Sequence, residues 1–386
     1  MIRHTIMLLT AMVCTFMASC GSGKSPEAES ASAIALDEFT DTVYAPEFAR
    51  RFVVTKAPDK QSLLLTVSNP WQGADSGSSQ LLLLRGGEMA PAGFTGAVVD
   101  SVASRLVAMS TTNVAMLDRL KELDKVVAVS GRRFLTTPRL PKDIIDAGNE
   151  ADADFEAIVS AAPDLALIYG VSTPSVMEPK LKQLNIPYVY IADYLEQSPL
   201  GRAEWLVALG YLTGREKEAI DQFSEIARRY KDLKASIDEL PAGNRPKVML
   251  NAPYNDVWYM PDRNSYMVTL ITDAGGRYIN DSNSTGTSVA VGDEEAFMMA
   301  QQSDIWLCPG SFATIKELTA TLPRFASARP VKNGQVWNNT LQATSTGGND
   351  FYESGSVNPD RILEDLIEII NPTDHDYQPY YFKQLR

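Results

Sequence analysis

The chain has 386 residues, which suggests two or three domains, and its 45% of apolar residues can fill ordinary hydrophobic cores. The formal net charge of −13 argues against nucleic acid as a partner. His4 and His375 are the only histidines, so the commonest zinc ligand and general base is almost missing. We therefore expect no histidine-based metal site, no resident cofactor and no enzymatic activity.

The first twenty residues have the pattern of a secretory leader. A basic start at Arg3 precedes an apolar run over about 6–17, which is too short for a good membrane-spanning helix. The segment "MASC" resembles a bacterial lipobox, although Met17 stands where leucine is usual. This resemblance implies that Cys20 is the lipidated first residue of the mature protein, with a plain secreted protein as the alternative. Residues 21–38 are then expected to form a tether.

Residues 39–100 have a β-rich pattern. The apolar runs "RRFVVT", "SLLLTV" and "QLLLLR" are short and are separated by turn-forming segments such as "NPWQGADSGSS". The sequence predicts a β-rich N-terminal extension here, either an appendage or the first layer of a lobe, and does not indicate its role.

Residues 101–212 alternate between strand and helix patterns. The segments "RLVAM", "KVVAVS", "PDLALIYG" and "PYVYIA" read as buried strands, and "TTNVAMLDRLKEL", "DADFEAIVSAA" and "VMEPKLKQL" read as the helices between them. Such alternation predicts an α/β lobe with a largely parallel sheet.

Residues 213–241 contain one long helical pattern, "REKEAIDQFSEIARRYKDLKASIDEL", without proline or glycine. Its apolar residues recur every three or four positions and form a single stripe. Twenty-five helical residues would make a rod of about 37 Å. We expect this helix to join two lobes as a stiff strut, so that scattering profiles of the free and bound protein differ little. A packing helix inside one large domain is the alternative.

The alternation resumes in residues 242–372, and residues 373–386 are expected to be a tail. "KVMLNA", "SDIWLCPG" and "GQVWNN" read as strands, and "SYMVTLITDAGG", "EEAFMMAQQ" and "PDRILEDLIEII" read as helices. The segments 155–170 and 294–310 also follow one plan of glutamate, apolar helix, aspartate, buried strand and glycine. The fold class predicted is α/β: two α/β lobes with mainly parallel sheets joined by one long α-helix, plus the β-rich extension.

Five segments in this order resemble a known family. "RLVAMSTTNVAMLDRLKELDKVVAVSG", "DADFEAIVSAAPDLALIYG", "LGRAEWLVALGYLTG", "SYMVTLITDAGG" and "NPDRILEDLIEIINP" are similar to the periplasmic binding proteins of iron–siderophore, haem and cobalamin importers. The resemblance covers about residues 100–372. It implies a monomer in the periplasm, attached to a membrane by its lipid alone, that holds its ligand between two lobes and delivers it to the permease of an ABC importer.

The resemblance also implies a docking residue in each lobe. Members of this family offer one surface glutamate from each lobe tip to basic pockets of the permease. The matching positions are Glu156 in "DADFEAI" and Glu295 in "GDEEAF", with Glu294 as the alternate. A carboxylate on each lobe suits one arginine cluster on each permease half. Solvated residues near helix N-termini are the alternative interpretation.

Candidate ligand contacts follow the ends of the predicted strands, where two facing lobes would present their loops. They are Thr111, Thr112, Arg132, Arg133 and Tyr169 in the first lobe, and Tyr254, Trp258, Asn338 and Tyr352 in the second. The threonines could instead cap a helix, the arginines could be surface charges, and Tyr169 and Trp258 could be core residues. Aromatic rings and guanidinium groups together suit a bulky, flat or anionic iron chelate.

The expected ligand is a ferric siderophore or similar metal chelate, followed by cobalamin and haem. Bare ferric ion held by tyrosines and carboxylates stays open, because the chain has 15 tyrosines. A function of another class, a metal-dependent hydrolase or a chelatase, would also use paired α/β lobes. The P-loop pattern and the G-x-S-x-G pattern are both absent from the sequence.

Overall fold

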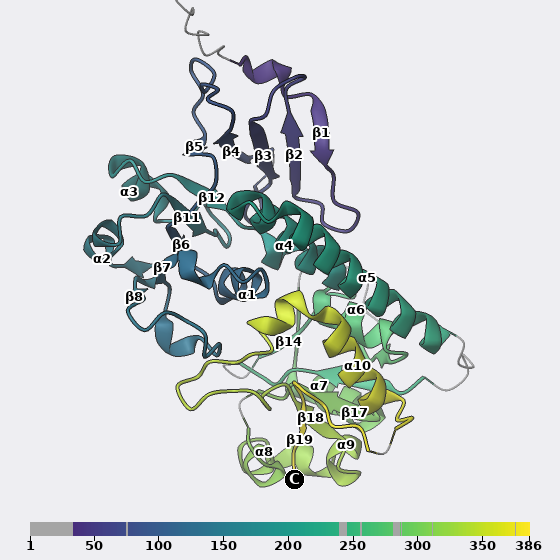
Figure 1. The fold of residues 1–386 in the computed structure, drawn as a ribbon. Coiled ribbons are helices and arrows are strands. Elements are labelled where there is room, and N and C mark those ends of the chain that lie inside the picture. The colour runs from purple at the N-terminus through teal and green to yellow at the C-terminus, as the bar shows by residue number, and fades with distance from the viewer. Residues whose placement is uncertain are drawn as a thin grey trace, which may run out of the picture.

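The computed structural model describes residues 34–74, 76–238, 245–254, 257–280, 286, 288–310, 312–374 and 376–386. The leader, Cys20 and the tether as far as residue 33 lie outside these described residues. Figure 1 shows an N-terminal sheet, an α/β lobe and a second α/β lobe following one another, with one long helix beside the last two. None of the helices in the described part of the chain is long and apolar enough to cross a membrane.

The extension is a five-stranded sheet whose strands lie in sequence order. Each pair of neighbouring strands in this sheet is antiparallel except β4 and β5, which are parallel. The strands are β1 (Asp41–Tyr44), β2 (Phe52–Lys56), β3 (Leu63–Ser68), β4 (Ser78–Leu84) and β5 (Ala97–Asp100), preceded by the 3-10 turn η1 (Leu36–Glu38). Ile34 is buried against this sheet, so the expected tether ends before it rather than at residue 38.

Both faces of the extension sheet are apolar. Alternate residues of a strand point to opposite sides of a sheet, and here both sets include apolar residues. Leu64 and Leu82 lie on the outer face, where Ile34 and Phe39 cover them. The inner face belongs to the same hydrophobic core as the first lobe, through residues that include Phe52, Val54, Leu63, Leu65, Leu81 and Leu83. The extension is therefore a layer of the first lobe and not a separate domain.

The N-terminal lobe (N-lobe) is built on a fully parallel sheet of order β12-β11-β6-β7-β8. Its strands are β6 (Leu106–Ala108), β7 (Val126–Val129), β8 (Ile145–Asp146), β11 (Leu165–Ile168) and β12 (Tyr188–Tyr190). Its helices are α1 (Thr111–Arg119), α2 (Phe155–Ser160), α3 (Glu178–Gln183) and α4 (Pro199–Thr213), with short turns η2 (Leu123–Lys125), η3 (Arg132–Phe134) and η4 (Asp193–Leu195) and the small ribbon β9 (Gly148–Asn149) and β10 (Asp152–Ala153).

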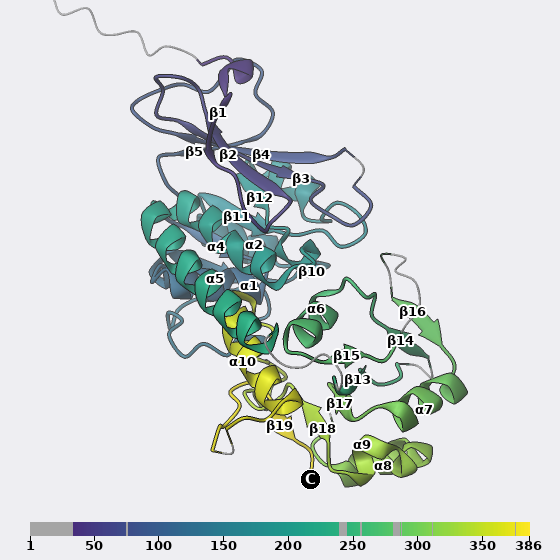
Figure 2. The same ribbon diagram turned by 90° about the vertical axis from the view of Figure 1, so that its right-hand side faces the viewer.

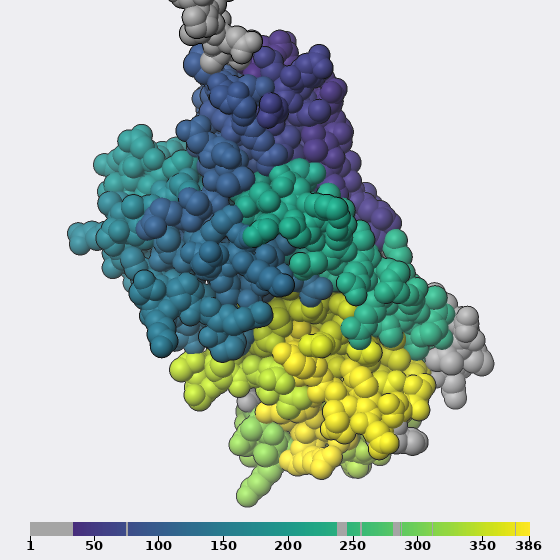
Figure 3. Space-filling view, viewed as in Figure 1, coloured from purple at the N-terminus to yellow at the C-terminus, as the bar shows by residue number. Residues whose placement is uncertain are grey.

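The long helix predicted from the sequence is α5 (Glu216–Asp238). Gly214 ends the preceding helix α4 with φ +76°, a conformation that glycine adopts without steric cost, so the chain turns back at once. The two helices then pack so closely that a Cβ at Gly210 would lie 2.5 Å from the Cβ of Ala219. Figure 3 shows the outer surface of α5 as a teal ridge that runs from the blue N-lobe to the yellow C-terminal segments.

The second half of α5 holds the C-terminal lobe (C-lobe). The hydroxyl of Tyr230 donates to Asp273 Oδ2 at 2.7 Å, and Lys234 pairs with Asp273 Oδ1 at 2.6 Å. Arg229 pairs with Asp360 at 3.4 Å and with Glu364, both on the last helix. Figure 2 shows this last helix, α10 (Pro359–Ile370), beside the lower half of α5. The strut therefore packs on both lobes.

The C-lobe sheet has the order β15-β13-β17-β18-β19 and is parallel except for the last pair. Its strands are β13 (Lys247–Leu250), β15 (Arg277–Tyr278), β17 (Ile305–Leu307), β18 (Val336–Asn338) and β19 (Lys383–Gln384), with a separate ribbon of β14 (Trp258–Met260) and β16 (Val289–Val291). Besides α10, its helices are α6 (Tyr266–Asp273), α7 (Asp293–Gln302), α8 (Ile315–Thr321) and α9 (Arg329–Lys332), with turns η6 (Pro323–Ser327) and η7 (Ser354–Val357). The separate tail expected from residue 373 is wrong, because β19 pairs with β18 as an edge strand of the lobe.

The two similar segments noticed in the sequence occupy equivalent places. In the N-lobe the carboxylate of Asp164 accepts from the backbone N–H groups of Ser104 at 2.7 Å and Arg105 at 3.0 Å, just before β6. In the C-lobe the carboxylate of Asp304 accepts from the backbone N–H of Lys247 at 2.8 Å, where β13 begins. Each aspartate thus joins the starts of two neighbouring parallel strands. The lobes repeat one βαβ plan, and the prediction of two α/β lobes joined by a long helix is confirmed.

Candidate ligand-binding site

A cavity of about 870 Å³ lies between the two lobes. Its C-lobe wall comes from the loops after β13, β17 and β18, and the N-lobe contributes Thr111, at the start of α1, and Phe134, at the end of η3. The carboxyl ends of parallel strands meet at one edge of a sheet, which is the usual place for a ligand in α/β proteins. The position of the cavity therefore matches the cleft expected from the sequence.

Two lining residues of the C-lobe, each directly after a strand, have a left-handed backbone conformation. Asn251 follows β13 with φ +64°, and Cys308 follows β17 with φ +56°. This left-handed region is uncommon for residues with a side chain, although asparagine tolerates it better than most. Burial raises the pKa of the Cys308 thiol to about 12, so this sulfur is a neutral thiol at pH 7 and a poor nucleophile.

Exposed aromatic rings dominate the cavity wall. Tyr254 is 71% exposed, Tyr352 60%, Tyr259 47% and Phe134 40%. Single exposed aromatic residues are ordinary, but four that line one cavity give it an apolar surface of the kind that marks binding sites. Their faces could pack against a flat or bulky ligand, while the phenol groups keep hydrogen-bonding capacity at its edges.

The polar groups of the described cavity lining are amides, hydroxyl groups, one thiol and one ammonium group. Asn338 is buried and uses its amide nitrogen on the backbone carbonyls of Gly310 and Phe312, so it supports the loop after β17. Asn339 donates to the hydroxyl of Tyr352 at 3.3 Å and orients that ring. Lys383, from β19, is the one charged residue among the described residues that line the cavity. The electrostatics there favour a neutral or anionic ligand.

Four of the predicted ligand contacts line this cavity, namely Thr111 from the N-lobe and Tyr254, Asn338 and Tyr352 from the C-lobe. Thr112 does not. Its backbone N–H is capped by the hydroxyl of Ser110 at 3.3 Å, and the two hydroxyl groups lie 2.9 Å apart. The cap of α1 is therefore Ser110, and Thr112 lies in the first turn of that helix.

Trp258 is a core residue and not a cavity residue, which corrects the prediction. Its side chain is fully buried against Trp306 and Phe325, and its indole N–H donates to the backbone carbonyl of Leu250 at 3.0 Å. The strand β14 alternates buried, exposed and buried residues, so its neighbour Tyr259 faces outward. Tyr259 is the aromatic residue of this strand that reaches the cavity.

Arg132, Arg133 and Tyr169 do not line this cavity. The guanidinium of Arg132 donates to the carbonyls of Ile144 at 3.2 Å and Lys142 at 3.0 Å, so it holds its own loop. Arg133 lies over the ring of Phe134 at 4.5 Å and thereby supports a cavity residue. Tyr169 is half-buried against the main core, and burial raises the pKa of its phenol.

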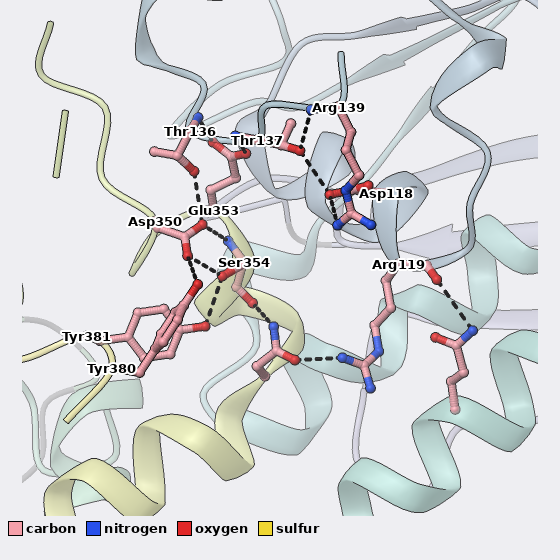
Figure 4. A network of polar contacts seen from close by, with 12 residues as sticks. Asp118, Arg119, Thr136, Thr137, Arg139, Asp350, Glu353, Ser354, Tyr380 and Tyr381 are labelled. Atoms are coloured by element: carbon pink, nitrogen blue, oxygen red, sulfur yellow. Dashed lines mark hydrogen bonds and ion pairs between the residues drawn. The ribbon is translucent and has the colours of Figure 1, made fainter. Parts of the chain in front are cut away.

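The lobes also meet beside the cavity through a polar contact, which we call the interlobe clasp: Thr136 and Thr137 of the N-lobe with Asp350 and Glu353 of the C-lobe. The carboxylate of Glu353 accepts from the backbone N–H groups of Thr136 at 2.7 Å and Thr137 at 2.9 Å, one on each oxygen. The hydroxyl of Thr136 donates to Asp350 at 2.9 Å. Figure 4 shows these groups pointing toward one another across the interface.

Replacing Glu353 by glutamine should destabilise the protein by about 1–3 kcal/mol, because the amide NH2 group cannot accept the second backbone N–H, whereas both oxygens of the carboxyl group can in either protonation state. Burial raises the pKa of Glu353 in the folded state, although the backbone donors oppose this rise. The stability that Glu353 contributes is therefore full below its unfolded pKa and falls as the pH rises through its folded pKa. Urea denaturation of wild type and Glu353→Gln from pH 4 to 7 should show a difference that shrinks with increasing pH; a growing difference would contradict this assignment.

The two predicted docking glutamates lie in equivalent first turns of helices. Glu156 is exposed in α2, and Glu295 is exposed in α7. Neither has a hydrogen bond or ion pair with the part of the chain that the structure describes. Glu294, the alternate, pairs with Arg324. The carboxylate of Glu295 is therefore the more available of the two neighbours.

Among the described residues, no three or more His, Cys, Asp or Glu side chains form a group that could hold a metal ion. The described residues that line the interlobe cavity offer aromatic rings, amide and hydroxyl groups, one thiol and one ammonium group.

Known proteins of similar sequence and structure support this arrangement. An uncharacterized lipoprotein of Methanocaldococcus jannaschii is 26% identical over 290 residues, which cover 71% of this chain and 67% of the relative. A periplasmic heme binding protein from Pseudomonas aeruginosa has a TM-score of 0.57 at 16% identity, with 74% of this chain and 99% of that chain covered. A possible iron-binding (periplasmic solute-binding) protein from Staphylococcus epidermidis has a TM-score of 0.54 at 19% identity, with 70% and 99% covered.

The sequence model of one family matches residues 106–339, which is more than half of the chain and includes α5 and both sheets apart from β19. The chain belongs to the periplasmic binding protein family.

Proposed function

We propose that the protein captures a ferric siderophore, or a similar metal chelate, in the cavity between its lobes and delivers it to the permease of an ABC importer. The observation that carries this proposal is that four exposed aromatic side chains line the interlobe cavity, whose described lining has one charged residue, Lys383. Periplasmic binding proteins serve transporters and release their ligands unchanged, so the site requires no nucleophile or general base. The structures of similar fold include proteins named for iron and heme binding.

Ligand binding can be measured by the quenching of tryptophan fluorescence. Trp306 donates its indole N–H to the carbonyl of Asn251, a cavity residue, at 2.7 Å, so a bound chromophore would lie close to this ring. We expect saturable quenching by a ferric siderophore at one ligand per protein, with the ligand recovered intact by mass spectrometry. Stronger quenching by cobalamin or haem would change the ligand assignment, and chemical conversion of the ligand would indicate an enzyme.

Removing two rings of the wall should weaken binding strongly. We expect Tyr254→Ala combined with Tyr352→Ala to lose about 2–3 kcal/mol of binding free energy, a 30- to 150-fold increase in Kd, since buried rings dominate such contacts. Both rings are exposed without ligand, so the fold should tolerate their removal. The matched control, Tyr254→Phe with Tyr352→Phe, keeps the rings and should stay within a few-fold of wild type. Equal affinity of the alanine variant and wild type would place the ligand elsewhere.

We further propose that Cys20 carries a lipid that anchors a monomer to a membrane in the periplasm. The lipobox-like segment and the lipoprotein names of related proteins support this. Glu156 and Glu295 would then face the two halves of the permease. Their exposure in equivalent turns of the two lobes is the structural support for this role.

A further inference from the structure

The C-lobe has a second cavity, of about 840 Å³, at the opposite end of its sheet from the interlobe cavity. Lys247 and Asp304, which line it, stand at the starts of β13 and β17, whereas the interlobe cavity follows the ends of the same strands. The two sites are therefore separated by the length of the sheet. The function proposed above makes no use of this second cavity.

Five basic side chains surround this cavity in a protein whose net charge is −13. They are Arg245, Lys247, Arg263, Arg277 and Arg329. Lys247 and Arg277 are register partners on neighbouring parallel strands, so two cationic side chains start from adjacent backbone positions. Like charges held this close repel one another, and an anion bound between them would offset this repulsion.

Asp304 is the one carboxylate among the described residues that line this second cavity, and both of its oxygens already have partners within the protein. Asp304 Oδ2 accepts from the backbone N–H of Lys247 at 2.8 Å, and Asp304 Oδ1 pairs with Arg329 at 2.7 Å. The side chains of Arg245, Lys247 and Arg263 have no hydrogen-bond or ion-pair partner within the described ranges of the chain. Three cationic groups around one cavity are thus left without a counter-charge from those ranges.

We propose that this cavity binds an anion of the phosphate class that carries more than one negative charge or several phosphoryl oxygens. Four of the five cations are arginines, whose planar forks donate two parallel hydrogen bonds to a phosphate group. The amide side chains of Asn264 and Asn280 also line the cavity and can serve the uncharged parts of such a ligand. Its volume exceeds the need of one phosphate ion, so a phosphorylated small molecule or a phospholipid headgroup is the expected size.

The test is calorimetric titration of the purified protein with pyrophosphate and with glycerophosphoglycerol, a soluble analogue of a phospholipid headgroup. We expect binding of at least one probe, which weakens as salt is added because the attraction is between charges. Preference for pyrophosphate would indicate a soluble phosphorylated ligand, and preference for the diester would indicate a lipid headgroup. No binding of either probe, or equally strong binding of citrate, would overturn the assignment.

The variant Arg245→Gln, Lys247→Gln and Arg263→Gln removes the three cations that have no partner within the described residues, and it should lower the affinity for the preferred probe at least tenfold. A matched control changes three exposed cations of the same lobe outside the cavity, Lys316→Gln, Lys332→Gln and Arg386→Gln, and should leave the affinity unchanged. An equal loss in both variants would mean that net charge, and not this cavity, attracts the anion. Siderophore binding should survive in the first variant, which separates this proposal from the function of the interlobe cavity.

Discussion

Reversing the charge of Glu156 and Glu295 together, to lysine, should reduce ligand uptake about 100-fold while leaving ligand affinity unchanged. Both side chains are exposed at the first turns of α2 and α7, one on each lobe. If each meets an arginine cluster of the permease, its replacement by lysine sets like charges against one another, which costs several kcal/mol. The measurement is uptake of a labelled ferric siderophore by cells whose only copy of the protein is the variant, with fluorescence quenching of the purified variant alongside.

A matched control carries the same change of net charge on another surface. Glu218 and Glu225 are exposed on α5, so Glu218→Lys with Glu225→Lys should leave uptake near the wild-type rate. Normal uptake by the variant at Glu156 and Glu295 would remove these residues from the docking surface. Equal losses in the two double variants would point to net charge and not to the lobe tips.

The largest effect on stability is expected from Glu204→Ala. Glu204 is a buried carboxylate in α4, and it accepts four hydrogen bonds from the extension: the hydroxyl of Tyr44 at 2.7 Å and the backbone N–H groups of Glu47, Phe48 and Ala49 at 2.8 Å each. Alanine leaves three backbone donors without an acceptor inside the protein. We expect a loss of roughly 3–5 kcal/mol, measured by urea denaturation.

The site of that loss can be tested separately. The lost hydrogen bonds join the extension to α4 of the N-lobe, and the extension shares the core of that lobe. We therefore expect a protease to cut within β1–β5 before it cuts the C-lobe. The control is Asp221→Ala, which removes an exposed ion pair with Lys217 on α5 and should cost less than about 1 kcal/mol. A Glu204→Ala protein as stable as that control would mean that water or another group satisfies the three donors.

Local patterns in the sequence were sufficient for most of the fold. The alternation of apolar strands and amphipathic helices is a short-range signal, and it located β6, β7, β11 and β12 as well as the rod α5. The packing of the extension was not predictable in this way. It depends on Glu204 meeting residues 47–49, more than 150 positions earlier in the chain, and no short pattern announces such a contact.

The candidate site was predictable in part for the same reason. Strand ends indicated Tyr254 and Tyr352, but the sequence could not tell which of Trp258 and Tyr259 points inward, since a period of two fits either register. Arg132 looked like a ligand contact because it follows a strand, yet its guanidinium binds carbonyls of its own loop. Phe134 and Asn251 had no signal of their own in the sequence beyond lying in loops after β7 and β13.

Residues 383–386 include Lys383, which forms part of the wall of the interlobe cavity, so experiments on this protein should retain them. Lys383 reaches the cavity because β19 pairs with β18, and the segment is secured further by the N–H of Leu385 on Val336 and by the N–H of Ile315 on the carbonyl of Arg386. A protein that lacks residues 383–386 would keep its two lobes and the helix α5, but it would lack part of the wall of the interlobe cavity and the ammonium group of Lys383. Affinities measured on such a trimmed chain would describe a different receptor.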